Sequence, residues 1–232
     1  MNRKHAVRFL AAPALFAGFL AFAAPARAQG SGPLSFDELA LFIEWNSVDG
    51  DTEIRLTLDS DVGLKGLKVR GPDGKKVVGL TAKGNPNIGQ RKVELESPEP
   101  VPGAVFAAFP EGVYQFRGRS IDGEKLLGEV TLSHALLAPV TINAPASGAT
   151  NVPINGITAD WTPTPGVTRY IVEVEEEDDE DNSLVVDLPA NLTSFTLPDG
   201  WLLPDTVYQI AVGAVGPTGN ITIYEHLFTT AP

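Results

Sequence analysis

The sequence of 232 residues contains no cysteine. This absence excludes disulfide bonds, thiol nucleophiles, zinc–thiolate sites and iron–sulfur clusters. Histidine is nearly as scarce, and His134 and His226 lack the paired spacing of a metal site. No phosphate-binding loop and no Gly-x-Ser-x-Gly motif is present. We therefore expect no catalytic residue, no cofactor and no metal ion.

Long apolar runs are also missing, except near the start of the chain. The first eight residues include three basic ones, residues 9–24 are apolar and uncharged, and small residues occupy positions Ala26 and Ala28. This order is typical of a cleavable export signal, and the apolar run is shorter than the roughly 20 residues that span a bilayer. We expect a signal peptide over residues 1–28, a periplasmic or secreted location, and no membrane insertion after cleavage.

Basic residues are scarce in the remainder of the chain. Removing residues 1–28 takes away four basic and no acidic residues, so 13 basic and 29 acidic side chains remain, with a net charge of −16. After residue 137 the sole basic residue is Arg169, against 13 acidic residues. Such a charge repels nucleic acid and anionic lipid. We expect no nucleic-acid partner, and the partner is an unknown protein or glycan of the envelope or exterior.

The length after the signal suits two domains of ordinary size. Residues 29–33 predict a flexible start, and the Ala-Leu-Leu-Ala-Pro segment that ends at Pro139 indicates a boundary between residues 34–137 and 138–232. Both parts alternate apolar and polar residues between turn signals, which is typical of β-sandwiches. Residues 103–109 are expected to form one short helix. The predicted fold class is all-β, with two β-sandwich domains in tandem.

The first predicted domain contains two recognisable turn patterns. Residues 67–75 read Leu-Lys-Val-Arg-Gly-Pro-Asp-Gly-Lys, and residues 113–133 alternate around an Asp-Gly turn at Asp122. This combination loosely resembles the immunoglobulin-like modules of bacterial surface proteins. The resemblance implies an immunoglobulin-like sandwich over residues 34–137.

Three aromatic residues mark the second predicted domain. Trp161 ends an early strand, Tyr170 opens the strictly alternating strand that follows, and Tyr208 comes after a Leu-Pro-Asp-Thr segment. With the order of the strands, these positions resemble a fibronectin type III domain across nearly all of residues 138–232. The resemblance implies that Trp161 and Tyr170 are structural and that Tyr208 forms a tyrosine corner.

The closing strand of the second domain has an irregular pattern. Ile221 and Ile223 share one face of a strand, whereas Phe228 falls on the other face. If all three side chains enter the core, one extra residue must be inserted between them. We therefore expect a β-bulge near residues 224–226.

An acidic run over residues 173–181 is the most unusual feature of the sequence. It holds eight carboxylates in nine positions, interrupted only by Val174. The candidates for contact with a basic partner or a hard cation are Glu175, Glu176, Glu177, Asp178, Asp179, Glu180 and Asp181. Calcium loops interleave Gly and Asn among the acids, and this run has neither before Asn182. The pattern favours a solvated strand end whose like charges block edge-to-edge association.

Three functions are compatible with the sequence. The preferred hypothesis is a non-catalytic extracytoplasmic binding or spacer protein. The first alternative is a carbohydrate-binding accessory protein, in which Trp45, Trp201 or Tyr224 stacks on a sugar ring. The second is a hydrolase that uses a pair of carboxylates, although nothing in the sequence selects a pair. Exposed coplanar rings would favour the first alternative, and a cleft with two facing acids would favour the second.

Overall fold

The computed structural model describes residues 33–82 and 89–232, with the side chains of residues 180 and 181 left out. The predicted signal peptide, and the predicted flexible start up to residue 32, lie outside the described residues. Within the described part, no helix combines the length and the apolar character needed to cross a membrane. That part consists mainly of strands with one short helix, so the all-β fold class is confirmed.

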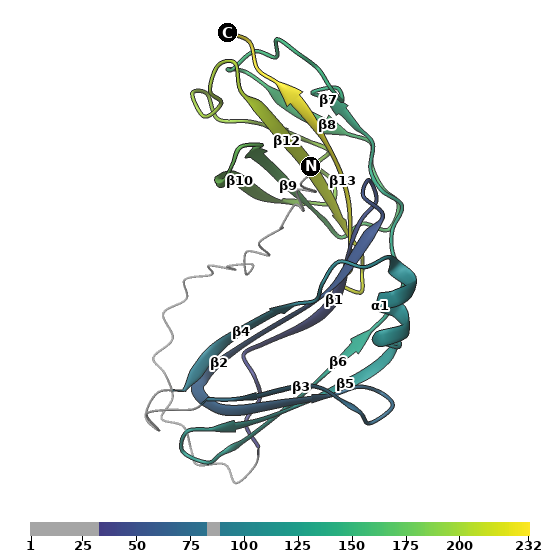
Figure 1. Ribbon diagram of the computed structural model, residues 1–232, viewed down its shortest axis with the longest axis vertical. Coiled ribbons are helices and arrows are strands. Elements are labelled where there is room, and N and C mark those ends of the chain that lie inside the picture. Colours follow the sequence, from purple (N-terminus) through teal and green to yellow (C-terminus); the bar gives the residue numbers. More distant parts are fainter. Residues whose placement is uncertain (1–32, 83–88) are drawn as a thin grey trace.

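Ten strands form one large sheet and three form a smaller one. The large sheet has the order β10-β9-β12-β13-β1-β2-β5-β6, with β3 and β4 also paired to β2, and the small sheet has the order β11-β8-β7. We call residues 34–137 the N-terminal half and residues 138–232 the C-terminal half. Figure 1 shows the C-terminal half above the N-terminal half, with β1 leading from one to the other.

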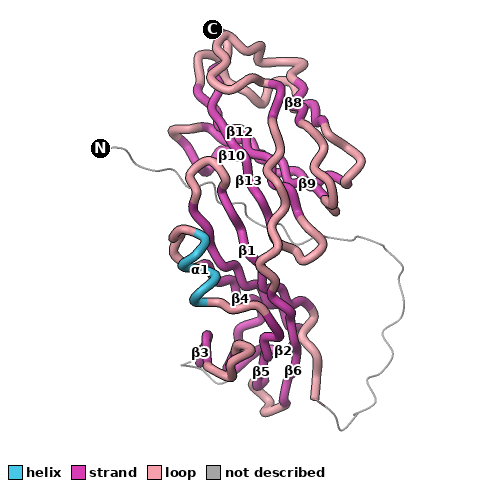
Figure 2. The backbone as a smooth tube through the Cα atoms, turned by 90° about the vertical axis from the view of Figure 1, so that its right-hand side faces the viewer, coloured by secondary structure: helices cyan, strands magenta, loops and turns pink. Residues whose placement is uncertain are grey.

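The elements of the N-terminal half are β1 (Glu38–Asn46), β2 (Asp51–Arg70), β3 (Lys76–Thr81), β4 (Gln90–Glu96), α1 (Pro102–Ala108), β5 (Gly112–Ser120) and β6 (Lys125–Leu132). Those of the C-terminal half are β7 (Ile142–Ala144), β8 (Thr158–Trp161), β9 (Arg169–Glu176), β10 (Asp179–Pro189), β11 (Ser194–Thr196), β12 (Val207–Val215) and β13 (Ile221–Thr229). The side view of Figure 2 shows the same strands in two stacked units, with α1 at the edge of the lower one.

The long strand β2 belongs to both layers of the N-terminal half. Its first part pairs with β1 and β4, and its second part, from Leu64, pairs with β3 and β5. The register shifts between Asp59 and Leu64, where the strand bends (Figure 1). The bend needs glycine, because a Cβ on Gly63 would lie 2.9 Å from the Cα of Gly89. The N-terminal half is thus a sandwich whose two layers share one strand.

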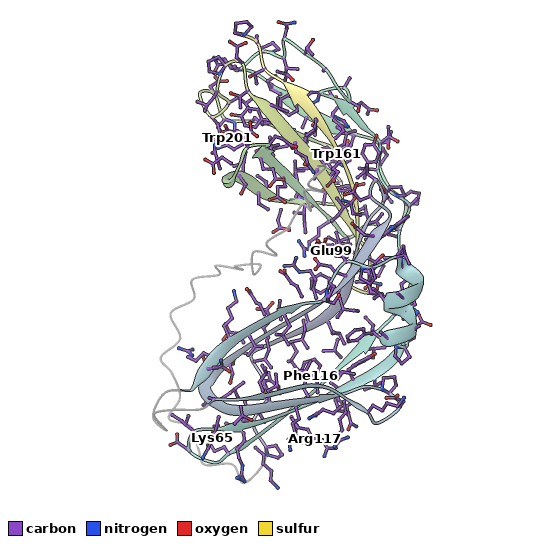
Figure 3. All side chains as sticks on the ribbon, viewed as in Figure 1. Lys65, Glu99, Phe116, Arg117, Trp161 and Trp201 are labelled. Atoms are coloured by element: carbon purple, nitrogen blue, oxygen red, sulfur yellow. The ribbon has the colours of Figure 1, made fainter. Side chains whose placement is uncertain are left out.

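Alternation along these strands fills the space between the layers. Phe116 points inward and is buried, while its neighbour Arg117 points outward and is exposed (Figure 3). The short helix α1 contributes Val105 to the same core. Side chains from β1, β2, β4, β5 and β6, together with Phe36 before β1, make up the rest of the cluster, which is what one buried and one solvated face per strand predicts.

The C-terminal half is a sandwich of a three-stranded and a four-stranded layer. The small sheet β11-β8-β7 packs on β10-β9-β12-β13, and the residues between them form one apolar cluster around Trp161 and Tyr170. This division into three and four strands is the fibronectin type III arrangement. The predicted resemblance is confirmed as a fibronectin type III-like fold.

The expected β-bulge near residues 224–226 is wrong. Strand β13 pairs with β12 without a shift from Thr229 to Ile221. Phe228 faces the core of the C-terminal half, whereas Ile221 and Ile223 belong to a second apolar cluster on the outer face, which also contains Phe42 of β1. The apolar side chains of β13 occur on both faces because both faces of this strand are buried.

The two halves are joined by a parallel pair of strands. Glu44 and Asn46 of β1 are register partners of Ile221 and Ile223 of β13. Strand β1 therefore extends the four-stranded layer of the C-terminal half while it also pairs with β2. The predicted boundary between residues 137 and 138 stays a prediction.

Candidate functional site

The three aromatic residues singled out in the C-terminal half are structural in their contacts. Trp161 packs edge-on against Tyr170, with ring centroids 5.4 Å apart. The Tyr170 hydroxyl accepts a hydrogen bond from the Thr164 N–H at 2.8 Å. The Tyr208 hydroxyl accepts one from the Leu203 N–H at 2.9 Å, which is the geometry of a tyrosine corner.

The predicted acidic candidates lie at the tip of the β9–β10 hairpin. Glu175 and Glu176 end β9, Glu177 and Asp178 form the turn, and Asp179 begins β10. The Asn182 amide donates a hydrogen bond to Glu176 Oε2 at 3.0 Å. The side chains of Glu180 and Asp181 lie outside the described part, and the role of the whole set as an interaction site stays a prediction. The first acid of the run, Glu173, belongs to a different environment.

Glu173 lies at the junction between the two halves. One part of this junction is apolar. Phe42 of β1 packs with Ile171 of β9, Ala211 of β12 and Ile221 of β13, all of them buried. These side chains lie on the outer face of the C-terminal sandwich, because their neighbours Tyr170, Val172 and Val212 enter its core. Strand β12 is accordingly buried along nearly its whole length.

Asn220 is the polar centre of the junction. Its side-chain oxygen accepts a hydrogen bond from the Ile43 N–H at 2.9 Å, and its amide donates to the carbonyls of Ser133 and Ala135, both at 2.8 Å. One side chain from the C-terminal half thus holds β1 and the segment that leaves β6. The turn that carries it is closed by Gly219, which adopts a φ of +86° that favours glycine.

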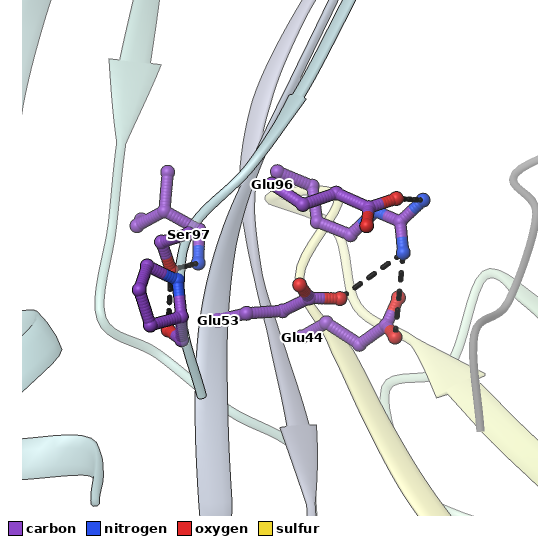
Figure 4. A network of polar contacts seen from close by, with 7 residues as sticks. Glu44, Glu53, Glu96 and Ser97 are labelled. Atoms are coloured by element: carbon purple, nitrogen blue, oxygen red, sulfur yellow. Dashed lines mark hydrogen bonds and ion pairs between the residues drawn. The ribbon is translucent and has the colours of Figure 1, made fainter. Parts of the chain in front are cut away.

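A group of carboxylates surrounds one guanidinium at the junction (Figure 4). Arg55 of β2 lies 3.0 Å from Glu53, 2.7 Å from Glu96 and 3.8 Å from Glu44. Arg55, Glu44 and Glu53 are buried, and Glu96 is partly exposed. Because Glu44 and Glu53 are register partners on β1 and β2, their carboxyls point to the same side of the sheet.

Two further carboxyls, Glu173 and Glu225, lie on the C-terminal side of the same face. They are 3 % and 7 % exposed, and one oxygen of each has no hydrogen-bond partner. Asn46 donates a hydrogen bond to the other oxygen of Glu225 at 3.0 Å. The five residues Glu44, Glu53, Glu96, Glu173 and Glu225 are named the junction carboxylates below.

Burial makes Glu44, Glu173 and Glu225 poor acids. It raises the pKa of Glu173 to about 8, to which the neighbouring Glu175 and Glu225 add and which Arg55 opposes. Burial also raises the pKa of Glu225 to about 7, against the hydrogen bond from Asn46. The pKa of Glu44 is held well above its usual range by burial, although Arg55 favours the ionised form. The junction therefore carries protons near neutral pH.

The two alternative functions call for exposed aromatic rings or a pair of facing acids. Among the described residues, no group of three or more His, Asp or Glu side chains is placed to hold a metal ion. The acids nearest Arg55 are engaged in ion pairs with it, whereas Glu173 and Glu225 each keep one oxygen without a hydrogen-bond partner among the described residues. In the same part of the chain, Trp45, Trp201 and Tyr224 are all half-buried, and Trp201 packs on Tyr208 at 5.5 Å.

One feature of the sequence indicates that a further element packs on the C-terminal half at this junction. Strand β12 reads Val-Tyr-Gln-Ile-Ala-Val-Gly-Ala-Val, which is apolar on both faces. A strand of that kind is buried on both faces, whereas the outer face of a fibronectin type III-like sheet normally meets water. The partner strand could not be identified from this pattern, because β1 lies far away in the sequence.

Comparison with known proteins adds solved structures alone. No family model matches the chain, and no curated protein matches it. It is similar to the fibronectin(III)-like modules of Clostridium thermocellum CbhA (12% identity, 84% of this chain and 93% of that one, TM-score 0.35). It is similar to a two-domain fibronectin type III segment of chicken tenascin (15%, 84% and 99%, TM-score 0.34) and to the FN1–FN3 domains of chicken CNTN1 (14%, 86% and 65%, TM-score 0.35). By its own strand order, the C-terminal half has a fibronectin type III-like fold.

Proposed function

We propose that this chain is a non-catalytic extracytoplasmic spacer or binding protein, which acts in the periplasm or outside the cell. The observation that carries the proposal is the parallel pairing of β1 with β13, which makes both halves part of one sheet. Domains in tandem usually meet through a linker and a small polar contact, so that they move relative to each other. A shared sheet with a buried apolar cluster fixes the angle between them instead.

A fixed angle suits a protein that holds two surfaces at a set distance. The contacts at Asn220 add to the rigidity, because they attach β1 and the segment after β6 to the same turn. The net charge keeps such a protein soluble and away from anionic lipid. A partner that the spacer presents or binds is therefore expected to be a protein or glycan of the envelope or the exterior.

The rigidity can be measured by electron spin resonance between two nitroxide labels. Because the chain has no native cysteine, Val113→Cys and Leu192→Cys place a single label on an exposed position of each half. We expect a narrow distance distribution. Asn220→Ala should broaden it, whereas Asn143→Ala, which removes an exposed hydrogen bond to Asp160 inside the C-terminal half, should leave it unchanged.

A broad distribution in the protein without a junction substitution would overturn the spacer role. The absence of catalysis needs a separate test with glycoside, ester and peptide substrates. Turnover that survives repurification and disappears when Glu173 or Glu225 is replaced by Gln would show that the junction carboxylates are catalytic. We expect no such turnover.

A further inference from the structure

The N-terminal half contains an apolar cavity of about 210 Å³. Eight of the residues that line it are aliphatic or aromatic, and they include Leu56 of β2, Val78 of β3, Leu95 of β4 and Phe109 after α1. Because side chains alternate along a strand, Ile54 and Leu56 point into the cavity, while Arg55 between them points to the junction carboxylates. The cavity and the junction therefore lie on opposite faces of the same strands.

Beside this cavity, the two layers of the sandwich are not joined by paired strands. Among the described strands, β3 and β4 each pair with β2 and not with each other, and Figure 1 shows them in different layers. At the edge of β6, by contrast, the backbone of Leu34, which precedes β1, exchanges hydrogen bonds with Lys125 and Leu127 at 2.8 and 2.9 Å. An entrance between the edges of β3 and β4 is thus built into the strand order.

The polar groups in the wall are already engaged. The Ser97 hydroxyl accepts a hydrogen bond from the Ile54 N–H at 2.9 Å and donates one to the Pro98 carbonyl at 2.8 Å (Figure 4). Glu96 is paired with Arg55. A water molecule needs two to four polar partners, so this wall does not favour ordered water. A charged or strongly polar occupant would likewise lose its hydration without replacement.

We propose that this cavity is a binding site for an uncharged apolar group, such as an aromatic ring or a short branched alkyl chain, which enters between β3 and β4. The volume supports the size of the group, since an apolar cavity of about 150 Å³ in another protein stays dry and binds benzene. The proposal is independent of the spacer role, because it concerns the interior of one half.

The first test uses benzene as the probe. Its binding to the full protein is monitored through the methyl signals in NMR spectra. We expect saturable shifts at the methyl groups of Leu56, Val78 and Leu95. Val78→Phe fills the cavity and should weaken benzene binding at least about tenfold, since the misfit of even one methylene group in an apolar pocket changes affinity by about that factor. The matched control is Val113→Phe on the exposed face of β5, which should bind benzene unchanged.

Leu95→Ala provides a second variant if Val78→Phe does not fold. It enlarges the cavity and should improve the binding of p-xylene relative to benzene. The proposal is overturned if benzene gives no saturable shift in the unsubstituted protein, if the shifts lie away from the cavity, or if Val78→Phe and Val113→Phe bind benzene equally. It is also overturned if Leu95→Ala leaves the preference between the two probes unchanged.

Discussion

The two halves of this protein solve the same packing problem differently. The C-terminal half places two separate layers around a core that contains Trp161, Tyr170 and Tyr208, each in contact with another aromatic ring. The N-terminal half folds one strand, β2, through both layers and leaves an apolar cavity where β3 and β4 do not meet. A sandwich that shares a strand gains a continuous backbone across its layers, and it loses close packing at the side opposite the bend.

Each half also has a buried tyrosine whose hydroxyl forms a hydrogen bond with nearby backbone. The hydroxyl is the acceptor in the C-terminal half and the donor in the N-terminal half. The Tyr208 hydroxyl accepts from the Leu203 N–H, whereas the Tyr114 hydroxyl donates to the Pro110 carbonyl at 3.0 Å. Burial raises the pKa of Tyr114 to about 12, with a further contribution from Asp73. The two halves therefore differ in closure and in polar detail, and four experiments test these differences and the junction that the halves share.

The largest difference should appear when a large side chain is removed from each core. Trp161→Ala should lower the free energy of unfolding by about 3–5 kcal/mol, because it leaves a void in a closed core. Leu56→Ala should cost about 2–3 kcal/mol, at the low end for its type, since the leucine already borders a cavity and makes fewer contacts. Urea denaturation of the whole chain measures both. A Leu56→Ala loss as large as that of Trp161→Ala would contradict the comparison.

The next effect concerns the junction that both halves share. Arg55→Met removes the cation that Glu44, Glu53 and Glu96 surround, and it should cost about 2–4 kcal/mol. The loss stays below that of a fully buried pair because Glu96 is partly exposed. Arg117→Met, at an exposed arginine of β5, is the control and should change stability by less than about 0.5 kcal/mol. Equal effects in the two variants would show that the junction pairs do not stabilise the fold.

Stability should fall as the pH rises through neutrality. The carboxyls of Glu173 and Glu225 have folded-state pKa values of about 8 and about 7, above the ordinary value of 4.5. Between about pH 4.5 and pH 8 the folded state binds protons that the unfolded chain has released. The contribution of the two carboxyls to stability is therefore greatest below about pH 4.5 and is lost by about pH 8. We therefore expect a continuous loss of stability between pH 5 and 8.

Melting temperatures measured from pH 5 to 8.5 test this dependence. The double variant Glu173→Gln/Glu225→Gln removes two of the titrating carboxyls and should reduce the slope of the curve across that range, although Glu44, whose pKa is also raised, remains. Glu129→Gln, at an exposed position of β6, should leave the curve unchanged. A curve that rises with pH in the unsubstituted protein would reverse the sign of the argument and contradict the buried state of these carboxyls.

The smallest difference should separate the two tyrosines. Tyr208→Phe leaves the Leu203 N–H without its acceptor and should cost about 1–2 kcal/mol. Tyr114→Phe leaves the Pro110 carbonyl without its donor and should cost about 0.5–1 kcal/mol, because a carbonyl oxygen tolerates missing partners better than an N–H does. Thermal denaturation of the two variants gives the order, and the reverse order would show that packing around the rings outweighs the lost hydrogen bonds.

Local chemistry determined much of this protein from the sequence alone. Alternation and turn residues predicted the strands around Asp122-Gly123, and the short helix was expected within one or two residues of α1. The resemblance to a fibronectin type III domain implied the tyrosine corner at Tyr208, which joins residues that are close in the chain. Each of these features depends on neighbours that the sequence places side by side.

The tertiary structure alone decided the junction. Ile43 and Asn220 are 177 positions apart, and the parallel pairing of β1 with β13 depends on both halves being folded. That pairing made the outward faces of Ile221, Ile223 and Glu173 interior, so the bulge expected from the strand pattern was unnecessary. A period of two tells which residues share a face, but whether that face meets water is decided by what packs on it.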